Sequence, residues 1–400
     1  MKRLWKMIPP CFSDVLGFEA VVNDTSGLGI VDDSSRYKPL KMNGNRGGGR
    51  PRGDFRRKGG PDGHRLPGLP GVRVVNSDIR NADIIHGTQQ KVLDTFDESV
   101  SQYEPDFVLL AYAPSSSMIG SDLDAAAEII GGQSGLPSAC VDLHGDKDYL
   151  YGVSCTLEAM GKLLLTKRDT IPNTVNLLGC NTLDWANETL SAVEEMLTSA
   201  GYTVLSRWGM KDTTENLKRA SAASVNLAVT AAGFRLARYM EAEFGIPCVA
   251  GAPFGADQWD ALLDQLQGAA KPAELPACEA PEVLVIGEQL TADAIRRALL
   301  RRGWQNIQVL SFYDMEKSFM QPGDQKLSSE DDLIKKMQQP SVRLVIGDPD
   351  CKAVLPRDIP WIELPNGASM SPANPVPNFN MAGEALDRWL DGVLQNRSNV

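Results

Sequence analysis

Residues 224–250 read SVNLAVTAAGFRLARYMEAEFGIPCVA, and this stretch decides the fold class. The apolar run Ser224–Val229 predicts a buried strand, and Phe234–Phe244 has apolar residues at helical spacing. Gly245-Ile-Pro247 ends the helix, and Cys248–Ala250 predicts a second strand. Strands that are joined through a helix run parallel, with a right-handed crossover. The stretch therefore predicts one unit of a parallel α/β sheet.

The same alternation extends through most of the chain and restarts twice. Before residue 170, strands are predicted at Phe107–Tyr112 and Ser138–Asp142, with helices after them at Asp122–Ile130 and Tyr151–Leu165. New cycles begin at Thr174 and at Glu282. Alternating strands and helices are typical of doubly wound sheets with helices on both faces. We therefore predict three Rossmann-like units, at residues 1–168, 169–275 and 281–400, separated near Lys167–Pro172 and by the Pro- and Ala-rich stretch 269–281.

Composition excludes several classes of function. The 400 residues carry a formal net charge of -11, which is atypical of a general nucleic-acid binder. An apolar run of 18 residues, which a membrane span needs, is absent, and Met1–Pro10 lacks the apolar core of a secretory signal. The cysteines are odd in number and form no C-x-x-C pair: Cys11, Cys140, Cys155, Cys180, Cys248, Cys278 and Cys351. A reduced, cytosolic protein without membrane contact is the expectation.

Nucleotide chemistry is also not expected of this chain. A G-x-G-x-x-G turn after a strand is missing, and so is a G-x-x-x-x-G-K-[ST] phosphate loop. We therefore expect no bound nucleotide. The segment Lys41–Arg73 is rich in Gly, Pro and Arg and is strongly basic in an acidic chain. It is interpreted as a loop, which is either a solvated insertion or a docking or anion-binding segment that orders in a complex.

Five motifs, in order along the chain, resemble those of the nitrogenase component 1 family, which includes nitrogenase subunits, cofactor-assembly scaffolds and dark-operative tetrapyrrole reductases. The motifs are Pro9-Pro10-Cys11 with Gly17-Phe18-Glu19, Asp83-Ile84-Ile85-His86-Gly87, Met118-Ile119-Gly120-Ser121-Asp122-Leu123, Val225–Pro247, and Val345-Ile346-Gly347-Asp348 with Ile359-Pro360. The resemblance implies three Rossmann-like domains. It also implies pairing with a homologous subunit and electrons from a separate ATP-dependent iron–sulfur reductase.

The resemblance further implies an iron–sulfur cluster shared at the subunit interface, for which this chain keeps few ligands. Cys11 matches the first cysteine position of the family. The second position falls near Ser26-Gly27-Leu28, without a cysteine, and serines stand where the third is expected. An oxygen ligand from a nearby aspartate is an alternative at the second position, with Asp24, Asp32 and Asp33 in range. The cysteine and histidine of a catalytic nitrogenase subunit are missing near Val229-Thr230 and Asn366-Gly367, so the chain resembles a partner-type subunit.

Polar residues after two predicted strands of the first unit are the other candidate site residues. Ser115, Ser116 and Gly120 follow the strand Phe107–Tyr112, where ligands of doubly wound sheets bind, although helix capping is the simpler interpretation. His144 and Asp148 follow the next strand and are candidates for proton transfer, or else belong to a solvated loop. We expect an oxidoreductase subunit that helps to form an interface cluster or substrate site. The alternative is a cluster-free scaffold for a metallocofactor or tetrapyrrole.

Overall fold

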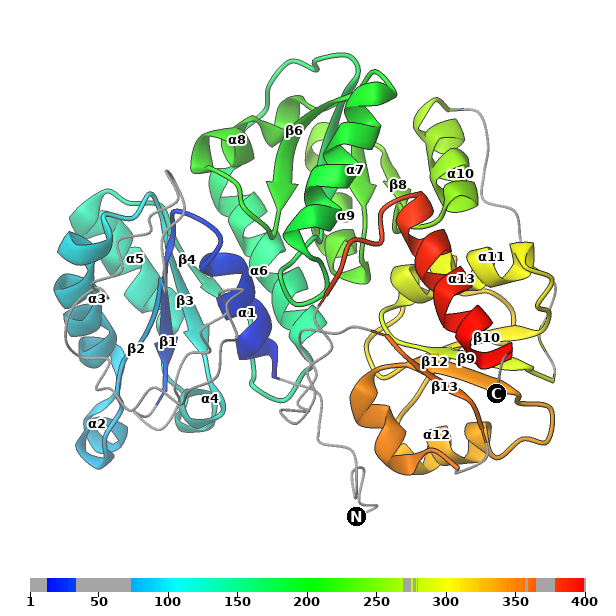
Figure 1. The fold of residues 1–400 in the computed structure, drawn as a ribbon. Helices are drawn as coiled ribbons and strands as arrows, with labels where there is room; N and C mark the ends of the chain where they lie inside the picture. The colour runs from blue at the N-terminus through cyan, green and yellow to red at the C-terminus, as the bar shows by residue number, and fades with distance from the viewer. Residues whose placement is uncertain are drawn as a thin grey trace.

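A computed structural model describes residues 13–33, 73–268, 275, 278, 280–356, 359–364 and 378–398. These residues form three sheets with helices packed around them (Figure 1), and every strand pair is parallel. The predicted fold class is therefore confirmed. Cys11 and residues 41–72 of the basic segment lie outside the described ranges. In the described part of the chain, none of the helices has the length and apolar character that crossing a bilayer requires.

The first sheet has the strand order β2-β1-β3-β4. Its elements are α1 (Asp14–Val22), β1 (Leu28–Asp32), β2 (Val74–Asn76), α2 (Asn81–His86), α3 (Gln89–Tyr103), β3 (Val108–Tyr112), α4 (Pro114–Ile119), α5 (Leu123–Ser134), β4 (Ser138–Val141) and α6 (Tyr149–Leu164). β1 and β3 lie in the middle of the sheet, and their apolar side chains are buried. Helices cover both faces of a parallel sheet, so the side chains on both sides of a central strand are buried and are mostly apolar.

The second sheet repeats this order as β6-β5-β7-β8. Its elements are β5 (Thr174–Leu178), α7 (Asn187–Ser199), β6 (Thr203–Trp208), α8 (Thr214–Arg219), β7 (Val225–Ala228), α9 (Phe234–Phe244), β8 (Cys248–Ala250) and α10 (Ala256–Leu266). The α9 helix buries Phe234, Leu236 and Met240 on one face. It ends at Gly245, which has φ +74°, a conformation that glycine adopts without steric cost.

The third sheet has five strands, in the order β11-β10-β9-β12-β13. Its elements are β9 (Val283–Ile286), α11 (Gln289–Arg301), β10 (Ile307–Ser311), β11 (Gln325–Lys326), α12 (Glu330–Met337), β12 (Leu344–Gly347), β13 (Trp361–Glu363) and the C-terminal helix α13 (Glu384–Ser398). In Figure 1, α13 runs alongside α11 at the boundary between the second and third sheets.

Each sheet has a switch point, where the chain leaves two neighbouring central strands in opposite directions. These strand pairs are β1 with β3, β5 with β7 and β9 with β12. Loops at the carboxyl ends of such strands diverge and leave a crevice in which doubly wound proteins bind ligands. The switch points are therefore the places to look for functional side chains.

The three units share their hydrophobic cores. One cluster joins residues of the second and third units with Leu386 and Leu390 of α13. A second cluster joins the first unit to Leu236 and Met240 of α9, and reaches Tyr313. The α6 helix lies between the first and second units and packs on both α1 and α9. The unit bounds 1–168, 169–275 and 281–400 stay predictions, because packing is continuous across them.

Candidate functional site

The switch point of the first sheet carries a buried carboxylate that three hydroxyl groups surround. Asp32 is the last residue of β1 and is fully buried. Its carboxylate accepts hydrogen bonds from Ser77 Oγ at 2.7 Å and from Thr88 Oγ1 at 2.8 Å. Thr88 Oγ1 also lies 2.6 Å from Ser121 Oγ. We call these four side chains the Asp32 network.

Burial and hydrogen bonding act on Asp32 in opposite directions. Removal from water raises the pKa of its carboxyl group, while the hydroxyls of Ser77, Thr88 and Ser121 lower it. The first effect is the larger, so the pKa lies above its ordinary value. Asp33, the next residue, accepts a hydrogen bond from Ser115 Oγ. Two carboxylates and four hydroxyl side chains therefore meet where β1 and β3 diverge.

The predicted site residues Ser115, Ser116 and Gly120 all lie at this switch point, in and just after α4. Ser115 contacts Asp33, whereas Ser116 is buried and caps its own helix. Ser116 Oγ accepts from the backbone N–H of Ala113 at 2.9 Å. Gly120 ends α4 with φ +70°, and no atom lies within 4 Å of the place where a Cβ would stand. Ser116 therefore caps α4 rather than the helix that begins after Asp122, and Ser115 is the side chain that contacts Asp33.

Exposed apolar side chains flank the same switch point. Met118 is 88% exposed and Ile85 is 79% exposed, with Ile84 and Ile119 beside them in the sequence also exposed. They belong to α2 and α4, which lie at the same end of the first sheet in Figure 1. We call these four residues the apolar rim. Exposed apolar groups of this kind are typical of surfaces that another protein covers.

A substitution at Thr88 tests whether the Asp32 network holds this edge together. Thr88→Val keeps the side-chain shape but removes the hydroxyl that contacts both Asp32 and Ser121. Because Asp32 then loses a buried donor, we expect the free energy of unfolding to fall by about 1–3 kcal/mol. Urea denaturation measures the change. Thr95→Val is the matched control, because Thr95 Oγ1 donates only to Lys91 O of its own helix; an equal loss in both variants would contradict the role of the network.

The other two predicted site residues, His144 and Asp148, follow β4. The His144 ring is half exposed, with Nε2 3.3 Å from Asp142 Oδ1, and its backbone N–H donates to the buried Asp14 carboxylate. Asp148 caps α6 by accepting from Tyr151 N at 3.0 Å, and burial raises its pKa to about 6. Within the described ranges, neither side chain hydrogen-bonds to Ser115 or Ser116. Their role in proton transfer stays a prediction.

A second cluster, at the junction of the three units, was not predicted from the sequence. Tyr149, at the start of α6, donates its hydroxyl to Asp184 Oδ1 at 2.6 Å, and Asn181 Nδ2 donates to Asp184 Oδ2 at 2.7 Å. Glu288 caps α11 and accepts from Ala231 N at 2.9 Å. Asp184 and Glu288 each follow the first central strand of their sheet. The available signal in the sequence was Gly179-Cys180-Asn181, which directly follows the apolar start of the cycle that begins at Thr174.

The six cysteines in the described ranges are free and buried or partly buried. Burial raises the thiol pKa of five of them, Cys140, Cys155, Cys180, Cys248 and Cys278. A cluster ligand must be a thiolate, which a raised pKa disfavours. Across the ranges that the structure covers, three or more His, Cys, Asp or Glu side chains nowhere gather as a metal site would need. Cys11 is the predicted ligand outside these ranges.

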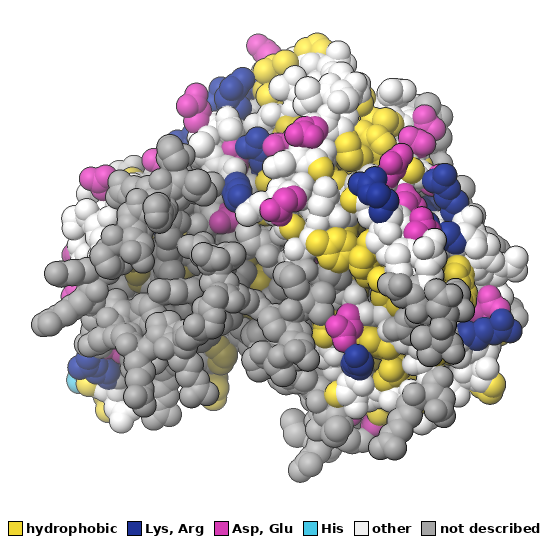
Figure 2. Space-filling view, in the orientation of Figure 1, with side chains coloured by type: hydrophobic (Ala, Val, Ile, Leu, Met, Phe, Trp, Pro, Cys, Tyr) yellow, Lys and Arg dark blue, Asp and Glu magenta, His cyan; other side chains and the backbone are white. Residues whose placement is uncertain are grey.

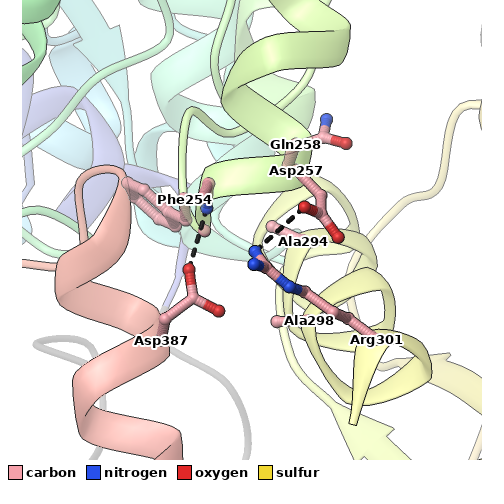
Figure 3. A pocket seen from close by; sticks show the side chains of 9 residues that line it. Phe254, Asp257, Gln258, Ala294, Ala298, Arg301 and Asp387 are labelled. Carbon is pink, nitrogen blue, oxygen red and sulfur yellow. Dashed lines mark hydrogen bonds and ion pairs between the residues drawn. The ribbon is translucent and has the colours of Figure 1, made fainter. Parts of the chain in front are cut away.

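A small niche between α10, α11 and α13 serves structure rather than ligand binding (Figure 3). Asp387 accepts from Ala256 N at 2.8 Å and so caps α10, and Arg301 pairs with Asp257 at 3.0 Å. Ala294 and Ala298 line its floor. The carboxylates of Asp257 and Asp387 in the niche thus already have partners. Figure 2 shows that acidic and basic side chains are likewise interspersed over the second and third units.

Residues 59–310 match the family model described as nitrogenase component 1 type oxidoreductase. The chain belongs to this family. Its proteins bind iron–sulfur clusters. The fold extends the match: a solved structure of nitrogenase Cp1 at pH 6.5 superimposes with a TM-score of 0.70, covering 99% of this chain and 95% of that one at 12% identity. A second structure, at pH 5, gives a TM-score of 0.68 at 14% identity over 99% of this chain and 90% of the other.

Curated relatives of this family member are B subunits of light-independent protochlorophyllide reductase. The protein from Prosthecochloris aestuarii is 28% identical over 55% of this chain and 42% of its own length. That from Chlorobium luteolum is 29% identical over 48% of this chain and 37% of its own length. The protein from Chloroflexus aggregans is 25% identical over 51% of this chain and 37% of its own length. The chain spans about two fifths of the length of these relatives.

Proposed function

We propose that this chain is a partner-type subunit of a nitrogenase-like oxidoreductase, which works in a complex with a homologous subunit. Electrons reach the complex from a separate ATP-dependent iron–sulfur reductase. The observation that carries the proposal is the family match combined with the ligand-poor switch points. A chain with this fold but few thiolate ligands contributes an interface, while the partner contributes most of the sulfur.

The apolar rim is the surface that we assign to the homologous subunit. It borders the switch point of the first sheet, so a subunit that covers it also closes the crevice beside Asp33 and Ser115. Closing the crevice removes water and strengthens electrostatic interactions inside it. The polar groups of this edge would then position a substrate between the subunits.

A tetrapyrrole is the substrate class that the relatives favour, because they are named as protochlorophyllide reductase subunits. A cluster-free scaffold that holds a tetrapyrrole or metallocofactor is the second candidate. It is favoured by one observation: Cys155, Cys180 and Cys351 are buried inside this chain, away from a surface at which a shared cluster would lie.

Metal analysis of the purified complex separates the two candidates. The chain is purified without oxygen, alone and together with its homologous partner, and iron and acid-labile sulfide are measured. We expect iron in the complex and little iron in the isolated chain. Cys11→Ser should lower the iron content of the complex. Cys351→Ser is the control, because Cys351 is buried in the third unit, and it should leave the iron content unchanged.

Activity of the same complex is measured with protochlorophyllide, ATP and a reduced iron–sulfur reductase. We expect the absorbance of protochlorophyllide to fall only when this chain, its homologous partner and the iron–sulfur reductase are all present. A complex that binds protochlorophyllide without iron, and never reduces it, would favour the scaffold. Iron that is complete in the isolated chain would contradict the partner-type assignment.

A further inference from the structure

The junction of the three units is held by contacts that each cross from one unit to another. The hydroxyl of Tyr149 joins α6 to Asp184, which follows β5. Glu288, which follows β9, accepts from the backbone of Ala231, which follows β7. The ring of Tyr313 packs on that of Tyr149 at 5.1 Å, edge to face. These contacts form a closed set, so displacement of one unit breaks at least two of them.

The same junction contains acidic groups in a setting that disfavours their charge. The groups acting on the Asp184 carboxyl are the Tyr149 hydroxyl from α6, the Asn181 amide from its own loop and the Glu288 carboxyl from α11. Tyr313 and Glu288 both act on Tyr149. Glu288 is 5% exposed and accepts hydrogen bonds from the backbone N–H groups of Ala231, Leu290 and Thr291 and from the Thr291 side chain. Two charged carboxylates at this junction would therefore repel each other across two units.

We propose that Tyr149, Asp184 and Glu288 form a proton-dependent clamp, which holds the three units closed while Asp184 is protonated and loosens when both carboxyls are charged. The hydrogen bond from Tyr149 and the cap by Glu288 supply the geometry of the clamp. Repulsion and the need of the carboxylates for water supply the opening force. The clamp is independent of electron transfer and is a property of the isolated chain.

The direction of the pH effect follows from linkage. In the closed form, burial raises the pKa of Asp184 to about 7, from an ordinary value of 3.8 that it regains when water enters. The closed form is therefore favoured fully below about pH 4, and this advantage is lost as the pH rises to about 7. Within that window the opening equilibrium increases by up to about tenfold per pH unit. Above it, the equilibrium no longer responds to Asp184.

Small-angle X-ray scattering of the full chain between pH 5 and pH 8 tests the clamp. We expect the radius of gyration of the wild type to increase toward neutral pH. Asp184→Asn cannot ionise, so it should keep the compact value at pH 8. Asp212→Asn is the matched control: Asp212 is also buried, with a raised pKa, but its partners Arg207, Thr213 and Asn216 all belong to the second unit. This control should expand with pH as the wild type does.

A second variant keeps the test decisive if Asp184→Asn does not fold. Tyr149→Phe retains the ring contact with Tyr313 but loses the hydrogen bond to Asp184, so we expect an expanded chain already at pH 5. A wild type whose dimensions are constant from pH 5 to pH 8 would overturn the proposal. So would an Asp184→Asn protein that expands with pH as strongly as the wild type, or a Tyr149→Phe protein that stays compact at every pH.

Discussion

Gly152→Ala is expected to lower the free energy of unfolding by about 3 kcal/mol, because α1 and α6 cross with their backbones in contact. A Cβ at Gly152 would stand 1.8 Å from Asp14 O, and one at Gly17 would stand 2.0 Å from Tyr149 O. Both obstacles are backbone atoms, which cannot move aside by a change of rotamer. The two helices would have to separate, and buried side chains of α1 such as Phe18 and Val21 would lose their packing.

Urea denaturation, followed by circular dichroism, measures this effect on the first unfolding transition. The control is Gly132→Ala, in the exposed part of α5, where no atom lies within 4 Å of the new Cβ. Alanine is the better helix former, so this control should stabilise the protein by up to about 1 kcal/mol. If Gly152→Ala and Gly132→Ala changed the free energy of unfolding equally, this would contradict the close backbone contact between α1 and α6.

Met118→Asp is expected to weaken binding of the homologous subunit by at least about 30-fold. A central apolar contact that is lost from a protein interface commonly costs 2 kcal/mol or more, and a buried, unpaired carboxylate adds a desolvation cost. The Met118 side chain is largely exposed in the isolated chain. The stability of the variant by itself should therefore stay within about 0.5 kcal/mol of the wild type.

Titration calorimetry with the purified partner measures this binding, and Ile85→Asp, on α2, should act in the same direction. Ile171→Asp is the matched control, because Ile171 is also exposed but precedes β5, at the opposite, amino-terminal edge of the second sheet. Equal affinity for the wild type, Met118→Asp and Ile85→Asp would show that the partner binds elsewhere. Loss of binding in Ile171→Asp alone would place the interface on the second unit.

Strands were predicted from the sequence where an apolar run lies between helix or turn signals. Cys248–Ala250 agrees with β8 residue for residue, and Phe107–Tyr112 agrees with β3 apart from its first residue. The strands β1 and β2 were not predicted. β1 contains Gly29 and ends at Asp32, and β2 directly follows the basic segment, so neither is preceded by the helix and Gly-Ile-Pro turn that marked β8. Tertiary pairing with β3 makes β1 a central strand despite its weak propensity.

The start of α5 was likewise not decided by the local sequence. Ser121 directly precedes the predicted helix Asp122–Ile130 and is a residue type that commonly caps helices, whereas in the structure Asp122 caps α5 by accepting from Ala125 N at 3.0 Å. Ser121 instead faces Thr88 in the Asp32 network. Both side chains are good capping residues, so composition does not decide between them. The position of Thr88, distant in the chain, gives Ser121 its partner.

The sequence by itself determined the α/β class, the three cycles of strands and helices, and the family. These features depend on local periodicity and on short motifs, which can be recognised in the sequence without knowledge of the tertiary structure. Only the tertiary structure decided that Asp32 meets Ser77 and Thr88, and that Tyr149, Asp184 and Glu288 meet at one junction. Those residues lie far apart in sequence, and the order of strands in the sheets brings them together. Their burial, and hence their raised pKa values, comes from packing between units, which a local pattern does not encode.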